Sequence, residues 1–321
     1  MSERVGASDK RQGWHWSDYW RNGRAEVMTI DSAAGAAPLD TAAFWRANLH
    51  GIVTGERVLD LATGSGQVAG YAAQVAAECG ETAEVIGVDY ADIAANARPL
   101  PTGVTLKGGV ALEALPFEAA QFDVATSQFG IEYADHRAAL AELARVCRPG
   151  ARVFLLLHHA DSAITRHSRR QIAAYDGVLG SGGAIRQARR AFTAHLKAAP
   201  APTRAAAEQA FREAVARATG RLEPEPGFDV PRYLVGYLAD LAARIAAYDP
   251  SSSLARLDAF ERGNSAWRQR QLCQTRAALD CAGMDGFLKR ASAVSLETSH
   301  QAEHHDADGA LIGWRVGLRR V

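Results

Sequence analysis

The sequence lacks three features that mark whole classes of protein. It has no hydrophobic run near the ~20 residues that a membrane-spanning helix needs, and the longest apolar run beside a motif is 153–157. Residues 1–14 lack the apolar stretch of a signal peptide. The four cysteines show no CxxC spacing: Cys79, Cys147, Cys273 and Cys281. We therefore expect a cytoplasmic protein with no membrane span, no disulfide framework and no bound metal.

The sequence also has no excess of charge. Lys and Arg together number 36, and so do Asp and Glu, which gives a formal net charge of zero. Proteins that bind nucleic acid nonspecifically present a basic surface to the phosphate backbone. We therefore expect no nucleic-acid partner, although a local basic patch is compatible with zero net charge.

Short apolar runs alternate with helical patterns in the first half of the chain. Five runs have the length and residue types of buried strands: 57–61, 84–88, 104–107, 122–126 and 151–157. Helical patterns over 68–79 and 138–146 stand between them. This order predicts a parallel sheet with helices on both faces.

The second half of the chain changes from helix back to strand. Residues 160–283 look helical throughout, with a last helix over 254–282 that ends near Gly283. Two strand-like runs, 291–298 and 311–318, then flank a turn signal. We predict an α/β fold: a doubly wound, Rossmann-like, mainly parallel seven-stranded sheet with a C-terminal antiparallel β-hairpin and a long helical insertion after the fifth strand.

A glycine turn follows the first strand. Gly64 and Gly66 precede a helix, where glycine lets a ligand approach the backbone and the helix N-terminus offers free N–H groups. Asp89 ends the second strand, about 20 residues further on, where an acid accepts hydrogen bonds from ribose hydroxyls. With Ala69, the turn also satisfies the loose GxGxxG/A pattern of dinucleotide-binding folds. Asp60, inside the first strand, would repel a pyrophosphate and suits a cationic ligand group.

At these residues the sequence resembles class I S-adenosylmethionine-dependent methyltransferases. It is most similar to the branch with ubiquinone/menaquinone C-methyltransferases and many small-molecule methyltransferases. The resemblance is carried by VLDLATGSG (58–66), VIGVD (85–89), EALPF (113–117), QFD (121–123) and LARVCRPG (143–150). The order and spacing of these segments agree over about residues 50–160, and the predicted terminal hairpin also agrees.

The resemblance implies S-adenosyl-L-methionine as the cofactor and assigns residues to two of its parts. The amino-acid end would be held by the first strand and the turn after it: Asp60, Ala62, Gly64, Ser65 and Gly66. Asp89 would bind the ribose hydroxyls, and Tyr90 would lie near the adenine.

Two further segments follow from the same resemblance. Ala111 stands where the family often has an acid that meets the adenine amino group, so Leu112 and its neighbour Val110 would act through backbone groups and packing. Ser127 and Gln128, at the end of the fourth strand, would lie near the methyl donor.

The reaction implied is transfer of a methyl group to an O, N or C nucleophile of a small-molecule acceptor. Methyltransferases that act on nucleobase or protein amines often carry an Asn/Asp-Pro-Pro-aromatic segment after the fourth strand, and this chain has Ser-Gln-Phe-Gly at 127–130. Two alternatives remain open: an NAD(P)-dependent oxidoreductase that uses the same turn, and a non-catalytic S-adenosylmethionine-binding protein.

The catalytic base has two adjacent candidates, His158 and His159, at the end of the fifth strand. Adjacent strand residues point to opposite faces, so at most one of them enters a given pocket; we favour His159. Second candidates are the polar residues after the fourth strand: Glu132, Tyr133, Asp135 and His136.

An aromatic stripe lies near the start of the chain. Trp16, Tyr19 and Trp20 recur at helical spacing, as in a helix that packs its rings on the core or covers a ligand pocket. We expect these rings, with Phe129, to line the acceptor pocket.

The length of 321 residues permits one core with an insertion or two modest domains. The motifs favour the first: residues 1–159 and 284–321 would form the cofactor-binding core. Residues 160–283 would form a helical lid that binds the acceptor, or else a dimer surface. We expect a monomer or a homodimer.

Overall fold

The computed structural model of the protein describes residues 14–21, 29–32, 35–52, 54–93, 100–222 and 229–321. It divides into a sheet unit and a helical unit. The sheet unit comprises the described residues up to Ile30, Pro38–Arg166 and Cys273–Val321, and the helical unit comprises those of Asp31–Ala37 and His167–Leu272. The chain leaves the sheet unit within α5 (Ala163–Leu179) and returns to it within α9 (Pro250–Ala277).

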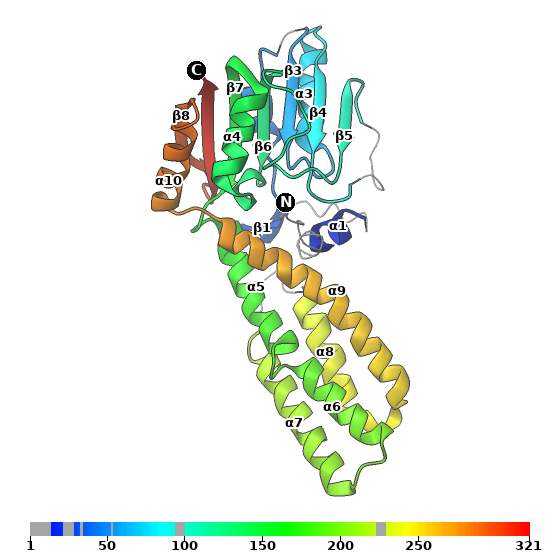
Figure 1. The fold of residues 1–321 in the computed structure, drawn as a ribbon. Coiled ribbons are helices and arrows are strands. Elements are labelled where there is room, and N and C mark those ends of the chain that lie inside the picture. The colour runs from blue at the N-terminus through cyan, green and yellow to red at the C-terminus, as the bar shows by residue number, and fades with distance from the viewer. Residues whose placement is uncertain (1–13, 22–28, 33–34, 53, 94–99, 223–228) are drawn as a thin grey trace, which may run out of the picture. The chain divides into compact units, whose positions relative to one another are not determined.

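The sheet has seven strands in the order β5-β4-β3-β6-β7-β9-β8 (Figure 1). Their bounds are β3 Arg57–Leu61, β4 Glu84–Val88, β5 Val104–Lys107, β6 Phe122–Gln128, β7 Cys147–His158, β8 Leu296–His305 and β9 Leu311–Arg320. β3 to β7 are parallel, whereas β9 runs antiparallel to both β7 and β8. The predicted sheet with its antiparallel C-terminal hairpin is confirmed.

The strand order reverses at β3. The chain runs outward from β3 through β4 to β5 and then returns to the other side of β3 with β6. In open α/β sheets, ligands bind where the order reverses, beyond the carboxyl ends of the strands. The loops that follow β3 and β6 are therefore where a site is expected.

Helices cover both faces of the sheet. They are α2 (Ala42–Leu49) and α3 (Gln67–Glu78) on one face and α4 (His136–Val146) and α10 (Cys281–Ser292) on the other. Val58 of β3 packs toward the first pair, and its neighbour Leu59 packs toward the second. Because both faces are buried, the central strands are mainly apolar runs, which is why the sequence predicted them.

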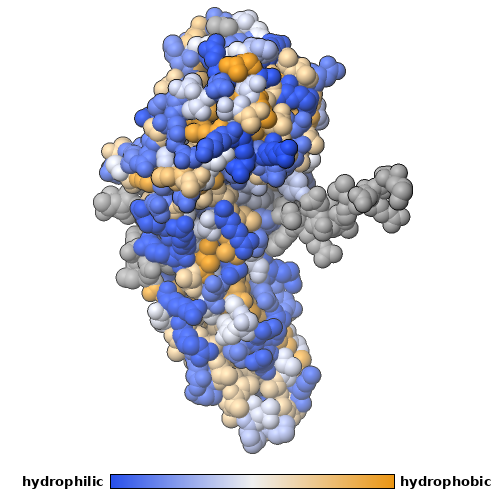
Figure 2. Space-filling model, turned by 60° about the vertical axis from the view of Figure 1, so that its left-hand side comes forward, coloured by the Kyte–Doolittle hydropathy of each residue, from blue (hydrophilic) through white to orange (hydrophobic). Residues whose placement is uncertain are grey.

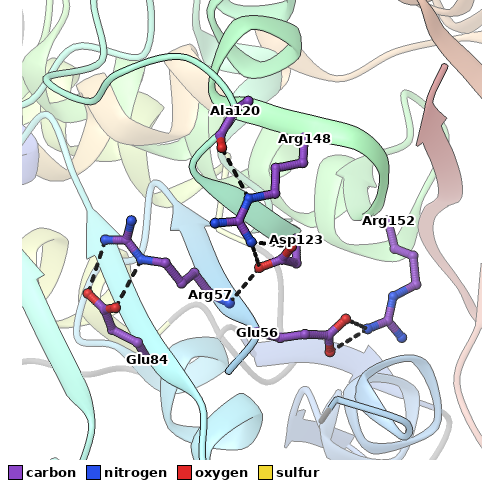
Figure 3. A network of polar contacts seen from close by, with 7 residues as sticks. All are labelled: Glu56, Arg57, Glu84, Ala120, Asp123, Arg148 and Arg152. Atoms are coloured by element: carbon purple, nitrogen blue, oxygen red, sulfur yellow. Dashed lines mark hydrogen bonds and ion pairs between the residues drawn. The ribbon is translucent and has the colours of Figure 1, made fainter. Parts of the chain in front are cut away.

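Ion pairs join the amino ends of the strands, at the edge opposite to the expected site (Figure 3). The Arg57 guanidinium donates to Glu84 of β4 over 2.9 Å, and its backbone N–H donates to Asp123 of β6 over 2.9 Å. Arg152 of β7 pairs with Glu56 at 2.8 Å. These groups are partly exposed, so each pair contributes at most about 1 kcal/mol. The network links the amino ends of neighbouring strands and lies away from the carboxyl edge, where the site is expected.

The boundaries after the helical unit differ from those predicted. The helical run expected over 254–282 is broken, because α10 begins within it. Gly283 belongs to the first turn of α10, and its N–H donates to the side chain of the N-cap residue Asp280 over 2.7 Å. The strand expected over 291–298 begins at Leu296, after α10 has ended. The prediction of a helix end at Gly283 was therefore wrong.

A second, two-stranded sheet was not predicted. It consists of β1 (Thr29–Ser32) and β2 (Gly35–Pro38). Each strand has four residues, and β2 reads GAAP, without the β-branched and aromatic residues that mark strands.

The helical unit has an apolar core of its own. Between α5 and α9 it contains α6 (Ala184–Leu196), α7 (Ala201–Thr219) and α8 (Asp229–Ala243). Large buried side chains of its core include Phe192, Phe211, Leu238 and Leu257. Arg189 of α6 forms ion pairs with Asp258 and Glu261 of α9. The predicted helical insertion is present, and its role toward an acceptor or a second copy stays a prediction.

Hydrophilic and apolar residues are interspersed over the visible surface of each unit (Figure 2). Within the ranges that the structure describes, no helix combines the length and the apolar composition needed to cross a membrane.

Candidate functional site

The loop between β3 and α3 is a turn with three residues in left-handed backbone. Ala62, Gly64 and Gly66 have φ values of 53°, 54° and 81°, and Ser65 stands between the glycines. Glycine adopts this conformation freely, whereas for Ala62 it costs roughly 1–2 kcal/mol. A Cβ added to Gly64 would lie 2.4 Å from the ring of Trp20. The turn therefore presents backbone to its surroundings, as a close ligand approach requires.

Asp60 is buried in β3, directly below this turn. Its two oxygens accept hydrogen bonds from the hydroxyls of Thr63 in the turn (2.6 Å) and Thr126 of β6 (2.7 Å). Burial raises the pKa of Asp60 to about 6, against the effect of these hydroxyls. The carboxylate joins the turn to two strands, and its predicted contact with a cofactor would use the lone pairs that remain.

Asp89 follows β4 and is buried beside the same turn. One oxygen accepts the Gly64 N–H over 2.8 Å, and the other accepts the Ala91 N–H over 2.8 Å. Burial raises the pKa of Asp89, and the two N–H groups lower it. Two carboxylates thus stand at the ends of adjacent strands, where their negative potential attracts a cationic group and repels a pyrophosphate.

The loop after β5 runs beside Asp89. The N–H of Val110 donates to the backbone carbonyl of Asp89 over 2.9 Å, which brings Ala111 and Leu112 to the same place. Leu112 is buried in the core, whereas the side chain of Tyr90 is exposed. The structure therefore gathers the predicted ribose and adenine residues around the end of β4.

Ser127 and Gln128 direct their side chains to other parts of the protein. The Ser127 hydroxyl donates to the Leu61 carbonyl over 3.0 Å. The amide oxygen of Gln128 accepts hydrogen bonds from Thr41 (2.8 Å) and from the indole of Trp45 in α2. Both residues position the end of β6, and their predicted closeness to the methyl donor stays a prediction.

The loops after β3 and β6 touch each other. Phe129, directly after β6, has a φ of 51°, so each of these two strands is followed at once by a non-glycine residue in left-handed backbone. A Cβ added to Gly130 would lie 2.3 Å from the Cβ of Ala62. Strained backbone of this kind gathers at functional sites.

The contact between these loops gives a first prediction. Gly130→Ala should destabilise the protein by about 1–3 kcal/mol, since the methyl group overlaps Ala62. Gly236→Ala in α8, where nothing lies within 4 Å of the added Cβ, should stabilise it by roughly 0.5–1 kcal/mol. Urea unfolding measures both. Equal effects of the two variants would show that the loops have room to separate.

His158, at the end of β7, faces the loop after β6. Its ring stacks on Phe129 with the centroids 4.4 Å apart and meets the edge of Tyr133 at 5.9 Å. Burial lowers the pKa of His158 to about 3, so the ring is neutral at physiological pH. Within the described residues, neither ring nitrogen has a hydrogen-bond partner.

His159 faces the opposite side, as strand alternation predicts. Its ring lies against Trp314 of β9 at 4.5 Å, and its Nδ1 accepts the Asp161 N–H over 2.9 Å. The Nε2 lies 3.8 Å from a carboxylate oxygen of Glu303. The structure brings His158, and not His159, to Phe129; the catalytic role of either histidine stays a prediction.

Glu132 was a second candidate for the catalytic base in the sequence, where a histidine was preferred. One of its oxygens accepts the backbone N–H of His158 over 2.9 Å. The other is buried and has no hydrogen-bond partner in the described part of the chain. Burial raises the pKa of Glu132 to about 7. The only signal in the sequence was an acid shortly after the fourth strand.

Helix α1 (Trp14–Arg21) lies along the carboxyl ends of the strands (Figure 1). Trp16 meets the edge of Tyr133 with ring centroids 5.6 Å apart, and Trp20 lies against Gly64. Tyr19 packs on Trp20 at 4.7 Å. The aromatic stripe therefore contacts both the glycine turn and the loop after β6.

A metal centre has no support among the side chains that the structure describes, which contain no group of three or more His, Cys, Asp and Glu residues suited to hold an ion.

The comparison with known families decides between the two cofactor classes. Residues 59–155, from β3 to β7, match the family model described as a methyltransferase domain. The matched residues are similar to the methyltransferase domain of class I S-adenosylmethionine-dependent enzymes. The matched range contains the glycine turn, Asp89 and Glu132, but not α1 or the helical unit.

Relatives of the methyltransferase core are found among bacterial proteins. An uncharacterized protein of Mycobacterium tuberculosis is 37% identical over 139 residues, which are 42% of this chain and 46% of that protein. The ubiquinone/menaquinone biosynthesis C-methyltransferase UbiE of Geobacter sulfurreducens is 34% identical over 122 residues, 35% of this chain and 46% of that protein. The chain spans about half the length of the curated relatives that it matches.

Among solved structures, an S-adenosylmethionine-dependent methyltransferase of Mesorhizobium loti is similar with a TM-score of 0.32 and 24% identity, over 37% of this chain and 53% of that one. The family match and the similarity to UbiE support S-adenosylmethionine as the cofactor of the methyltransferase core.

The residues of the core suit that cofactor. S-adenosylmethionine carries a positive sulfonium and a positive amino group, and two buried carboxylates, Asp60 and Asp89, lie beside the turn. Gly64 and Gly66, in left-handed backbone, leave their two positions of the turn without side chains. Each Asp89 oxygen has one N–H partner, and a carboxylate oxygen can accept a second donor such as a ribose hydroxyl.

Proposed function

We propose that the protein transfers a methyl group from S-adenosylmethionine to a small-molecule acceptor at the carboxyl edge of its sheet. The observation that carries this proposal is the division of that edge into two parts. The glycine turn and Asp89 lie over β3 and β4, whereas Phe129, Glu132 and His158 lie over β6 and β7. A cofactor bound over the first part leaves the second part to the acceptor.

The first part would hold the cofactor. Asp89 would accept from the ribose hydroxyls, with Tyr90, Ala111 and Leu112 beside the adenine. The amino-acid end would lie against the first strand and its turn, formed by Asp60, Ala62, Gly64, Ser65 and Gly66. When bound, S-adenosylmethionine supplies an electrophilic methyl group.

The second part would orient the acceptor. Methyl transfer needs no covalent bond to the protein, so the residues act by placing the nucleophile in line, excluding water and taking up a proton where one is released. Trp16, Tyr19, Trp20 and Phe129 offer aromatic surface for this. The zero net charge of the chain supports a small acceptor over a nucleic acid.

Calorimetric titration with S-adenosylmethionine and, separately, with NAD tests the cofactor assignment. We expect binding of S-adenosylmethionine and none of NAD; the reverse would make the protein an oxidoreductase. Transfer of a radiolabelled methyl group to a panel of small acceptors then tests the activity. Tight cofactor binding without transfer to any acceptor would favour a non-catalytic binding protein.

A further inference from the structure

We infer that Glu132 is the base that takes a proton from the acceptor, and that the acceptor is a planar, uncharged molecule with a phenolic or enolic hydroxyl. This inference rests on the proposed methyl transfer and adds the class of substrate to it.

Glu132 is held in place by one oxygen and leaves the other available. It lies in the 3-10 turn Ile131–Tyr133, directly after β6. Its Oε1 accepts the backbone N–H of His158 over 2.9 Å, which fixes the carboxyl group to the end of β7. Its Oε2 is buried and lacks a partner in the described residues. Buried acceptor atoms are nearly always satisfied, so an orphan at the reacting edge of the sheet indicates a donor on the ligand.

A cluster of aromatic rings includes His158, whose backbone N–H binds this carboxyl group, and Tyr133, the residue after Glu132. His158 stacks on Phe129 with an angle of 18° between the planes, and Tyr133 stands edge-on to His158 at 76°. Trp16 of α1 stands edge-on to Tyr133 at 87°. Flat, apolar faces of this kind stack on planar molecules, which indicates an aromatic or enolic acceptor.

The number of free acceptors distinguishes a hydroxyl from an amine. An ammonium group has three N–H donors and leaves them unsatisfied unless three acceptors surround it. The described side chains of this cluster present Oε2 of Glu132 and one nitrogen of the neutral His158 ring. A hydroxyl has a single proton to donate, so Oε2 alone satisfies it and keeps the acceptor oxygen free to attack.

The proton transfer balances with the methyl transfer. The acceptor O–H bond breaks and its proton moves to Oε2 of Glu132. The acceptor oxygen forms a bond to the methyl carbon, and the carbon–sulfur bond breaks with its electron pair left on sulfur. The negative charge of the Glu132 carboxylate and the positive charge of the sulfonium are both removed, so the reacting groups are neutral after the transfer.

Of the titratable groups in this cluster, Glu132 has the pKa that suits a base. Burial raises the pKa of Glu132 to about 7, although nearby backbone N–H groups, first that of His158, lower it. A pKa close to the working pH suits a general base. Burial holds the pKa of His158 at about 3, so that ring does not take up the proton. Burial, with the charges of Glu132 and Cys273, raises the pKa of Tyr133 well above its usual value, and its hydroxyl stays protonated.

The test compares Glu132→Gln, Glu132→Asp and the exposed control Glu118→Gln in the full chain. Glutamine keeps an oxygen for the His158 N–H but cannot accept the proton. The probes are S-adenosylmethionine with 1-naphthol, catechol or 4-methylumbelliferone, and 1-naphthylmethylamine, an ammonium ion at neutral pH, as the matched amine. We expect the wild type to methylate phenols and not the amine. Glu132→Gln should lower kcat/KM by about 10²–10⁴-fold while the Kd of S-adenosylmethionine stays within about twofold.

The pH profile separates a base from a structural residue. Wild-type kcat/KM should rise about tenfold per pH unit up to about pH 7 and then level off. Glu132→Asp should keep this rise at a lower rate, and Glu132→Gln should lose it. Unchanged kcat/KM in Glu132→Gln, or an unchanged profile, overturns the role of Glu132. Methylation of the amine alone, or of none of the phenols, overturns the acceptor class. Absence of S-adenosylmethionine binding in the wild type instead overturns the proposed function.

Discussion

Replacing Asp89 by alanine should weaken S-adenosylmethionine binding about 100-fold or more. Its carboxylate holds the N–H of Gly64 at 2.8 Å and would also accept from the cofactor's ribose. Loss of a hydrogen bond to a charged group costs roughly 1.5–3 kcal/mol, and every 1.4 kcal/mol is about tenfold in affinity. The alanine variant loses the ribose contact and also releases the glycine turn, so two such losses act on one binding site. Calorimetric titration measures the Kd.

Two further variants show whether the Asp89 carboxylate itself causes the loss of affinity. Asp89→Asn keeps one oxygen and removes the charge, so it should bind with an affinity between the wild type and Asp89→Ala. Asp92→Asn changes an exposed acid three residues further along and should leave the Kd unchanged. Circular dichroism establishes that each variant is folded. An Asp89→Ala protein that binds S-adenosylmethionine as the wild type does would place the ribose elsewhere.

The sheet and the glycine turn could be predicted because their signals are local. β3 and β4 are buried on both faces, which favours a mainly apolar run in the sequence, interrupted within β3 by Asp60. The turn needs left-handed backbone at Gly64 and Gly66, and glycine is the residue that adopts it freely. Both features are specified within a few neighbouring residues, so the sequence alone could identify them.

The contacts of the proposed acceptor side could not be predicted from the sequence, because they join residues that are distant in the chain. Glu132 and His158 are 26 positions apart and meet because β6 and β7 pair with Gln128 opposite Leu156. Several acids and histidines follow β6 in the sequence, and nothing local separated Glu132 from Asp135, which caps α4. The difference between an orphaned carboxyl and a helix cap is a property of packing, which a motif does not contain.

Replacing His158 by leucine should make the protein more stable, and the gain should grow as the pH falls. The ring is fully buried, and neither of its nitrogens has a partner in the described part of the protein. A buried polar group without a hydrogen bond costs roughly 1–3 kcal/mol, and leucine has a similar volume without polar atoms. Loss of the stacking on Phe129 offsets part of this, by about 0.5–1.5 kcal/mol. At pH 7.5 the net gain should therefore be small.

The gain grows in acid because the folded state resists protonation of His158. The pKa of His158 is about 3 in the folded protein against an ordinary value of 6.5, so between these values the unfolded chain binds the extra proton. Wild-type stability then falls by about 1.4 kcal/mol per pH unit below 6.5, and the leucine variant escapes this loss. Glu132 acts with the opposite sign, since its pKa of about 7 makes stability fall as pH rises from 4.5. That effect is present in both proteins and cancels in the difference.

Urea unfolding at pH 5.0 and 7.5 measures the free energy of unfolding of both proteins. The advantage of the leucine variant should be about 2 kcal/mol larger at pH 5.0 than at pH 7.5. His300→Leu, at an exposed position in β8, controls for the exchange of histidine for leucine. A stability difference that stays constant with pH would mean that the His158 ring finds water or a partner in solution. A more stable His158→Leu protein that has lost methyl transfer would show that the His158 ring serves the proposed acceptor surface at a cost in stability.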